Sequence, residues 1–298
     1  MGCLFGHLGG MNVITDLRCL EYSMPGHPER PARVERTVAH LKREVVSKLD
    51  WLEPELATRE QIERAHAPEH IQRVIDEEQF DADTPSYDSI HAHASRSAGS
   101  ALLALDLAMK GESAFSLMRP PGHHATRSRG MGFCYYNSIA IAALEALATG
   151  AKKVCVFDFD VHHGNGTEAI LKDLEGTAFF SVHQHPCYPG SGEKNVGSNC
   201  YNFPVQPGLE HTQYRKVLEY AFNELLKQKP DVIAVSAGFD GYVHDPLAQM
   251  TLEKSDFAGI GKMISGAGVP FFSILEGGYS EDLPELIEAY LEGVGWKG

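Results

Sequence analysis

The sequence predicts an α/β fold, a three-layer α/β/α arrangement in which a mainly parallel sheet lies between two layers of helices. Short apolar segments rich in β-branched and aromatic residues alternate with helical segments along the 298 residues, as in parallel strands joined by crossover helices. Polar, glycine-rich loops follow the predicted strands. No internal repeat, low-complexity tract or linker interrupts the chain, so we expect a single domain over residues 1–298.

Composition and charge argue against several classes of protein. The 43% hydrophobic and 22% charged residues are typical of a soluble globular protein. No apolar run is long enough to span a bilayer, and the N-terminus lacks the features of a signal peptide, so a cytoplasmic location without a membrane partner is expected. The net charge of −14 would repel nucleic acid and attract a cationic substrate, although solubility alone explains it equally well. The six cysteines show no CxxC spacing, which favours reduced thiols over a disulfide framework.

The N-terminal third is predicted to be helical, with a turn-rich loop at residues 23–28. Four helices are expected there: one that begins near Pro28 or Glu29 and carries the apolar stripe Val34, Val38, Leu41 and Val45, a short one opened by a capping box at 58–61, one at 68–75 and one at 94–109. The acidic loop at 76–88 has little apolar content and is expected to be exposed.

From residue 114 onward, strands and helices are predicted to alternate. Strands are expected at 114–118, 154–159, 177–182, 201–205, 232–236 and 269–275. Helices are expected up to about 148, at 167–174, 211–227 and 255–264, and after Asp282. The loop at 183–200 exceeds the usual length of a connection, which suggests a functional surface. Ligands bind beyond the carboxyl ends of strands in such sheets, so the loops at 119–132, 158–166, 238–245 and 276–279 are expected to form the site.

The predicted strand at 154–159 carries the strongest chemical signal. A period of two places Asp158, Asp160 and His162 on one face as far as the extended conformation lasts. Two carboxylates and an imidazole at the end of a buried strand are costly unless they are compensated, so we predict a divalent metal. Asp160 and His162 are the expected ligands, with Asp158 behind them. The alternative is a solvated acidic loop at the end of the strand.

Three further motifs carry reactive side chains, and each is weak evidence alone. The turn Pro120–Ala125 presents the adjacent His123 and His124, which suit acid/base work near neutral pH, although a surface turn is the alternative. Asp240 becomes a third metal ligand only if the sheet brings it beside Asp160, and it is otherwise a turn residue. The phenol of Tyr279 follows two glycines and can donate a hydrogen bond to an oxyanion.

Taken together, the motifs PPGHH, GFCYYN, DFDVHHGNGT, SAGFD and EGGY closely resemble the zinc-dependent histone deacetylase family, including bacterial histone deacetylase-like amidohydrolases. This family belongs to the arginase/deacetylase superfamily, which also contains acetylpolyamine amidohydrolases. GHPERP at 26–31 is similar to the family's early loop, and the resemblance extends from about residue 22 to 280. It implies the arginase/deacetylase fold and hydrolysis of an amide.

The resemblance also implies a role for each matching residue. Zinc would be held by Asp160, His162 and Asp240, and potassium by backbone carbonyls of Asp158, Asp160, His162, Ser181 and Val182. Tyr279 would polarise the scissile carbonyl. The family's tandem histidines fall on His123, backed by Asp158, and on His124, backed by Asn165. Because a carboxylate favours an imidazolium more than an amide does, we expect His123 to be the cationic partner and His124 the general base.

The resemblance finally implies a narrow tunnel for an acyl-lysine side chain. Phe133 and Tyr188 would form its walls, Gly132 would lie at its base, and Asp83 falls near the family's rim aspartate. Leu247 stands where polyamine deacetylases of the superfamily carry a glutamate. The expected activity is therefore removal of acetyl or other short acyl groups from lysine in proteins or peptides. The alternatives are deacetylation of acetylpolyamines, and an acyl-lysine-binding protein without turnover. No oligomeric state is predicted.

Overall fold

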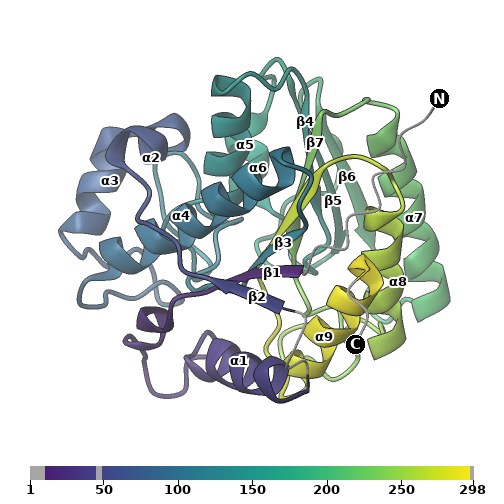
Figure 1. The fold of residues 1–298 in the computed structure, drawn as a ribbon, viewed down its shortest axis with the longest axis horizontal. Coiled ribbons are helices and arrows are strands. Elements are labelled where there is room, and N and C mark those ends of the chain that lie inside the picture. The colour runs from purple at the N-terminus through teal and green to yellow at the C-terminus, as the bar shows by residue number, and fades with distance from the viewer. Residues whose placement is uncertain (1–10, 45–48, 296–298) are drawn as a thin grey trace.

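A sheet of parallel strands organises the computed structural model, which describes residues 11–44 and 49–295 (Figure 1). Eight strands are hydrogen-bonded in the order β2-β1-β3-β8-β7-β4-β5-β6 within these residues, and every neighbouring pair is parallel. Their bounds are β1 (Met11–Ile14), β2 (Leu49–Leu52), β3 (Ala114–Ser116), β4 (Val154–Asp158), β5 (Thr177–Gln184), β6 (Cys200–Val205), β7 (Val232–Ala237) and β8 (Phe271–Leu275). The predicted parallel sheet is confirmed.

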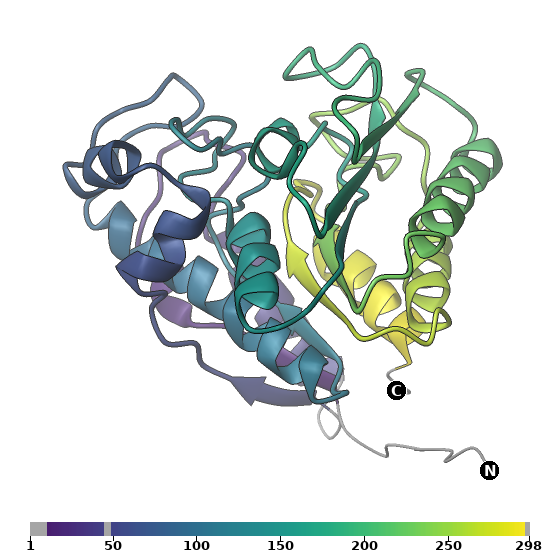
Figure 2. The same cartoon turned by 90° about the horizontal axis from the view of Figure 1, so that it is seen from above.

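Helices cover both faces of this sheet, so the three-layer prediction is confirmed. One face packs against α1 (Ala32–Glu44), α7 (His211–Leu226), α8 (Lys254–Ser265) and α9 (Leu283–Val294). The other face packs against α4 (Ile90–Met109), α5 (Ser138–Ala148) and α6 (Asn165–Leu171), with α2 (Arg59–Ala65) and α3 (Pro68–Ile75) lying outside them. Figure 2 shows α7, α8 and α9 in green and yellow on one side and the blue and teal helices on the other. The strands that lie between two apolar layers are fully buried, which explains their almost continuous apolar sequences.

Two strands and several boundaries differ from the sequence-based prediction. The sequence predicts no strand before residue 114, but β1 and β2 form one edge of the sheet. Each spans four residues, too few for a period of two to stand out, and β2 includes an acid. Helix α4 begins at Ile90 rather than Ala94, and α6 occupies 165–171 rather than 167–174.

Other predictions from the sequence are confirmed. The capping box at Thr58 is present, because its side chain accepts from Gln61 N–H and the Gln61 side chain accepts from Thr58 N–H. The five cysteines among the described residues are free. No helix in the described parts of the chain is long and apolar enough to cross a bilayer. Val45, predicted in the stripe of the first long helix, lies outside the described residues.

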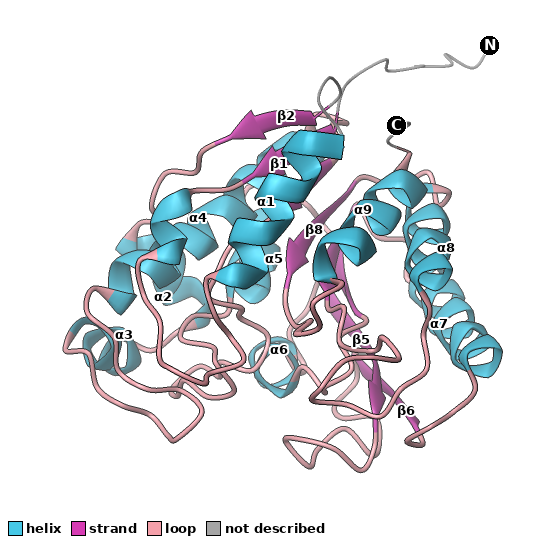
Figure 3. Ribbon diagram, turned by 90° about the horizontal axis from the view of Figure 1, so that it is seen from below, coloured by secondary structure: helices cyan, strands magenta, loops and turns pink. Residues whose placement is uncertain are grey.

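The sheet brings together the loops that carry the chemistry. Strands β3, β8, β7 and β4 are consecutive neighbours, and Ser236 of β7 lies opposite both Asp158 of β4 and Ile274 of β8. Parallel strands end at one edge, so the loops after all four strands meet there. Figure 3 shows loops gathered at this end of the sheet.

Candidate active site

A buried group of two carboxylates and one imidazole lies beyond β4 and β7. Asp160 and His162 follow β4, and Asp240 follows β7. One ligand atom from each lies within 4.8 Å of the other two. His162 Nδ1 is 3.2 Å from Asp160 Oδ1 and 3.0 Å from Asp240 Oδ2. The sheet therefore brings Asp240 beside Asp160. This is the condition under which the sequence analysis expects Asp240 to be a third metal ligand.

Backbone amides hold the remaining oxygens of the two carboxylates. Gly277 N–H donates to Asp160 Oδ2 over 2.7 Å, and Val161 N–H donates to Asp240 Oδ1 over 2.9 Å. A Cβ at Gly277 would lie 2.1 Å from Asp240 Oδ2, so only glycine allows this close approach. The carboxylates are fixed by these contacts, with one oxygen of each directed toward His162.

This donor set fits a divalent metal. Asp160 and Asp240 are fully buried, and burial together with the charge of Asp160 raises the pKa of Asp240 to about 7. Two buried carboxylates that share one imidazole leave negative charge that a bound cation would neutralise. Carboxylate and imidazole ligands suit zinc and other transition metals, and three protein ligands leave a coordination position free for water or substrate.

The two adjacent histidines lie beside this group, with ring centroids 4.0 Å apart. His123 Nδ1 is 3.1 Å from Asp158 Oδ2 and His123 Nε2 is 3.8 Å from Asp160 Oδ1. Burial disfavours the cation, but the charges of Asp160 and Asp158 more than offset it and raise the pKa of His123 to about 10. This geometry agrees with the prediction that His123 is the cationic member of the pair.

His124 has a neutral partner and a different electrostatic environment. Its Nδ1 is 2.7 Å from Asn165 Oδ1, and since an amide oxygen only accepts, Nδ1–H must be the donor. Nε2 is then left with its lone pair. Burial, followed by the charges of His123 and His162, holds the pKa of His124 well below its usual value. The pair therefore consists of one imidazolium and one free base.

Tyr279 stands between the metal-binding group and two side chains that fix its ring. Its N–H donates to Asp245 Oδ2 over 2.7 Å, and its ring centroid is 5.7 Å from that of Phe133. The Arg33 guanidinium carbon lies 4.8 Å from the centre of the Tyr279 ring. Burial and the charges of Asp240 and Asp160 outweigh Arg33 and raise the pKa of the phenol well above its usual value. The hydroxyl therefore stays protonated and can donate.

The predicted tunnel residues lie around these groups. A Cβ at Gly132 would meet the His124 ring at 2.5 Å and the Tyr188 ring at 3.0 Å, so the chain passes directly against both. Phe133 packs beside Tyr279, whereas the ring of Tyr188 lies 5.1 Å from that of His124 and is 38% exposed. Phe133 thus contacts Tyr279, whereas Tyr188 contacts His124 and reaches the surface.

The other predicted contacts are more peripheral. Asp83 is exposed, and its carbonyl oxygen lies 3.3 Å from Nε2 of His27, whose ring packs edge-on against Phe133. Leu247 is half-buried and connects to the site through Asp245 Oδ1, which accepts its N–H over 2.9 Å. Among the residues predicted to bind potassium, Ser181 lies opposite Asp158 in the parallel ladder, and its hydroxyl contacts Nδ1 of His183. Potassium binding stays a prediction.

Three buried residues near the site were missed by the sequence analysis. Arg33 donates from Nε to Gly278 O and from Nη2 to Glu276 O. Glu276 accepts the backbone N–H of Gly122 and of His123. Arg119 forms a two-point ion pair with Glu29. In the sequence, Arg33 is next to the apolar Val34, and Glu276 resembles part of a glycine turn. The available signal for these residues was a charged side chain within a segment that is otherwise predicted to be buried.

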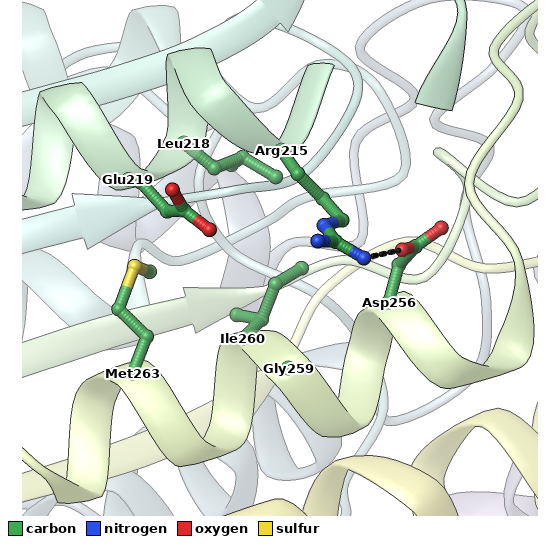
Figure 4. Close-up of a pocket in the computed structure, with 7 residues that line it drawn as sticks. All are labelled: Arg215, Leu218, Glu219, Asp256, Gly259, Ile260 and Met263. Carbon is green, nitrogen blue, oxygen red and sulfur yellow. Dashed lines mark hydrogen bonds and ion pairs between the residues drawn. The ribbon is translucent and has the colours of Figure 1, made fainter. Parts of the chain in front are cut away.

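Two surface hollows complete the description. The first, of about 440 Å³, opens beside Tyr279 and is lined by Met24, His27, Arg30, His244 and Pro246 among others. The second, of about 140 Å³, lies between α7 and α8, where Arg215 Nη1 is 3.2 Å from Asp256 Oδ1 (Figure 4). None of the predicted site residues lines this second hollow.

Comparisons with known proteins find relatives over most of the chain. A family model described as "Histone deacetylase domain" matches residues 27–294. A probable deacetylase of Methanothermobacter thermautotrophicus is 35% identical over 288 residues, which covers 90% of this chain and 86% of the relative. The crystal structure of the HDA15 HD domain superposes with a TM-score of 0.89 at 31% identity, covering 96% of this chain and 87% of that one. The acetylpolyamine aminohydrolase of Burkholderia pseudomallei gives a TM-score of 0.87 at 26% identity, covering 96% and 98%.

Proposed function

The chain belongs to the histone deacetylase family, and we propose that it is a zinc-dependent amidohydrolase that removes acetyl or other short acyl groups from lysine side chains. The observation that carries this proposal is the buried Asp160–His162–Asp240 group beside two histidines whose pKa values are shifted in opposite directions by their partners. An amide hydrolase needs a polarised carbonyl, a base for water and an acid for the leaving amine. A metal held by the first group would polarise the carbonyl, and the histidine pair would supply the base and the acid.

Asp160, His162 and Asp240 would hold the metal, for which we propose zinc. When bound, a zinc ion polarises a carbonyl oxygen and makes a coordinated water more acidic. To serve as a ligand, His162 would have to be unprotonated at Nδ1, the atom that faces both carboxylates. We also propose potassium at the backbone carbonyls of Asp158, Asp160, His162, Ser181 and Val182.

The histidines and the phenol would carry the proton transfers. Nε2 of His124 takes the proton of the attacking water and later gives it to the leaving amine, while Asn165 fixes the ring through Nδ1. His123, held as an imidazolium by Asp158, stabilises negative charge in the transition state. The Tyr279 hydroxyl donates to the carbonyl oxygen as it becomes an oxyanion.

The tunnel residues favour acyl-lysine as the substrate. Phe133 and Tyr188 present aromatic faces that suit a slender aliphatic stem, and Asp83 at the rim can accept backbone N–H groups of a peptide. The apolar Leu247, in place of a glutamate, provides no partner for a second amine. The second candidate function, deacetylation of acetylpolyamines, is favoured by the net charge of −14 and by the likeness to an acetylpolyamine aminohydrolase.

Side-by-side kinetics on two substrates test this assignment. Purified protein with its metal content measured is assayed on an acetyl-lysine peptide and on acetylspermidine. We expect the higher kcat/KM on the peptide, and we expect Leu247→Glu to shift the ratio toward the polyamine. A strong polyamine preference of the wild type would assign the second function instead. Bound zinc without turnover of either substrate would favour an acyl-lysine-binding protein.

A further inference from the structure

Glu276 is a buried carboxylate that the proposed mechanism does not use. It is the first residue after β8, the strand that lies between β3 and β7. The loop that carries His123 and His124 follows β3, and Ser236 lies on β7. A side chain at the end of the middle strand can therefore reach both neighbours. Its own N–H donates to Ala237 O, which fixes its starting point.

The contacts of Glu276 join these neighbours. Oε2 accepts the N–H of Gly122 over 2.7 Å and the N–H of His123 over 3.2 Å. Oε1 accepts the Ser236 hydroxyl over 3.1 Å. The residue is fully buried, so water cannot replace these partners without rearrangement. The hydrogen-bond donors that contact this carboxylate are two backbone amides and one hydroxyl.

The opposite side of the same loop is held in a complementary way. The carbonyl oxygen of His123 accepts the N–H of Gly166 over 3.0 Å and that of Thr167 over 3.1 Å. The peptide units around His123 are thus fixed through their N–H groups by Glu276 and through a carbonyl by the start of α6. Asn165, the partner of His124, belongs to that same turn of α6.

We propose that Glu276 is a positioning residue, which places the imidazoles of His123 and His124 by holding the backbone of Gly122 and His123 from the β8 side. This inference rests on the proposed function, because its effect is on catalysis by the histidine pair. We expect reach to matter more than charge, since the donors to Glu276 are neutral groups. The single oxygen of a glutamine amide can accept from the two backbone N–H groups, and its NH2 can donate to the Ser236 hydroxyl. A displacement of about 1 Å in a reacting group can lower a rate by about 10²-fold.

Two substitutions separate reach from charge. Glu276→Gln keeps the length of the side chain and an acceptor oxygen but removes the charge. Glu276→Asp keeps the charge but withdraws the acceptor by one methylene. We expect Glu276→Gln to keep most of the wild-type kcat, and Glu276→Asp to lower kcat by roughly 10- to 100-fold with KM and metal content nearly unchanged.

A buried acid elsewhere provides the matched control. Asp256 is also fully buried, accepts the N–H of Glu253 and pairs with Arg215 beside the hollow of Figure 4. Asp256→Asn should lower Tm without lowering kcat. If Glu276→Asp and Asp256→Asn both lower only Tm, Glu276 is a structural acid and the proposal is wrong. If Glu276→Gln lost kcat while Glu276→Asp did not, the charge of Glu276 rather than its reach would matter for catalysis. That result would also overturn the proposal.

Hydrogen exchange gives a readout that does not depend on turnover. Mass spectrometry should show faster amide exchange in a peptide that covers residues 120–125 for Glu276→Asp, and wild-type exchange for Glu276→Gln. Unchanged exchange in both variants contradicts the proposal even if the wild type is an active deacetylase. Absence of deacetylase activity in the wild type, with the expected exchange pattern, would instead disprove the proposed function. Should Glu276→Asp not fold, a loss of kcat in Glu276→Gln alone is sufficient to overturn the proposal.

Discussion

Two of the buried groups of charged side chains among the described residues are balanced in different ways. In the metal-binding group, the carboxylates of Asp160 and Asp240 share the single imidazole of His162. In the second group, which we call the ion-pair cluster, Glu29 accepts from Arg119 Nε over 2.5 Å and from Arg119 Nη2 over 2.7 Å. Arg33 Nη1 lies 3.4 Å from the same carboxylate.

The pKa shifts of the acids show the difference. Burial raises the pKa of Glu29, but Arg119 and Arg33 more than offset this and hold it below its usual value. Burial and Asp160 together raise the pKa of Asp240 to about 7. Guanidinium groups are permanently charged, so the ion-pair cluster is complete without a ligand. In the metal-binding group the pKa of an acid is raised instead, as expected where a bound cation rather than a guanidinium would balance the charge.

Arg33 connects the two groups. It takes part in the ion-pair cluster and also donates to the carbonyl oxygens of Glu276 and Gly278, which flank the glycine beside the metal-binding group. Its guanidinium lies over the ring of Tyr279. The structural cluster therefore supports the turn that carries the proposed oxyanion donor.

The largest effect is expected from Asp240→Asn. Loss of one charged ligand should remove the metal and with it several kcal/mol of transition-state stabilisation, which corresponds to roughly 10³-fold or more in kcat. Metal analysis and steady-state kinetics check this. Zinc added to the chelated wild type should raise Tm, because it binds only the folded state, and the variant should lose that increase. Full zinc binding by Asp240→Asn would contradict the assignment of this ligand.

The corresponding change in the ion-pair cluster should affect stability instead. Arg119→Met leaves the buried carboxylate of Glu29 with its longer contacts to Arg33 and to the Tyr22 hydroxyl, and breaking a buried pair in this way costs about 3–5 kcal/mol. Denaturant unfolding measures the loss. Arg59→Met is the control, because Arg59 and its partner Glu63 are 54% and 38% exposed and an exposed pair contributes at most about 1 kcal/mol. Equal losses of unfolding free energy in the two variants would show that the Arg119–Glu29 pair contributes no more than a surface ion pair.

The two groups also differ in how far the sequence revealed them. The metal ligands, the histidine pair and Tyr279 lie in short motifs directly after predicted strands, so local chemistry together with a resemblance identified them. The ion-pair cluster joins residues 29 and 33 to residue 119, and these two segments meet only in the folded protein. The edge strands β1 and β2 were missed for a related reason: four-residue segments are defined by their neighbours in the sheet rather than by their own pattern.

Tyr279→Phe tests whether the hydroxyl of this phenol takes part in catalysis. Removal of the hydroxyl deletes one oxyanion donor, which should lower kcat by roughly 10²-fold while metal content stays at the wild-type level. Steady-state kinetics on an acetyl-lysine peptide measure the change. Tyr290→Phe is the control, since its hydroxyl contacts Ser273 in the core, 2.7 Å away. If Tyr279→Phe kept full kcat, the phenol would have no part in the reaction.

The smallest effect is a change in the acid dependence of stability, and it concerns the ion-pair cluster alone. The pKa of Glu29 in the folded protein lies below that in the unfolded chain, so its contribution is present above the unfolded value of about 4.5 and is lost as pH falls through the folded value. The difference in unfolding free energy between wild type and Glu29→Gln should therefore be largest near neutral pH and decrease once the pH falls below the unfolded pKa. A single proton changes stability by at most about 1.4 kcal/mol per pH unit. Urea unfolding of both proteins between pH 7 and pH 3 measures the difference, and a constant gap over this range would show that the charge of Glu29 does not stabilise the fold.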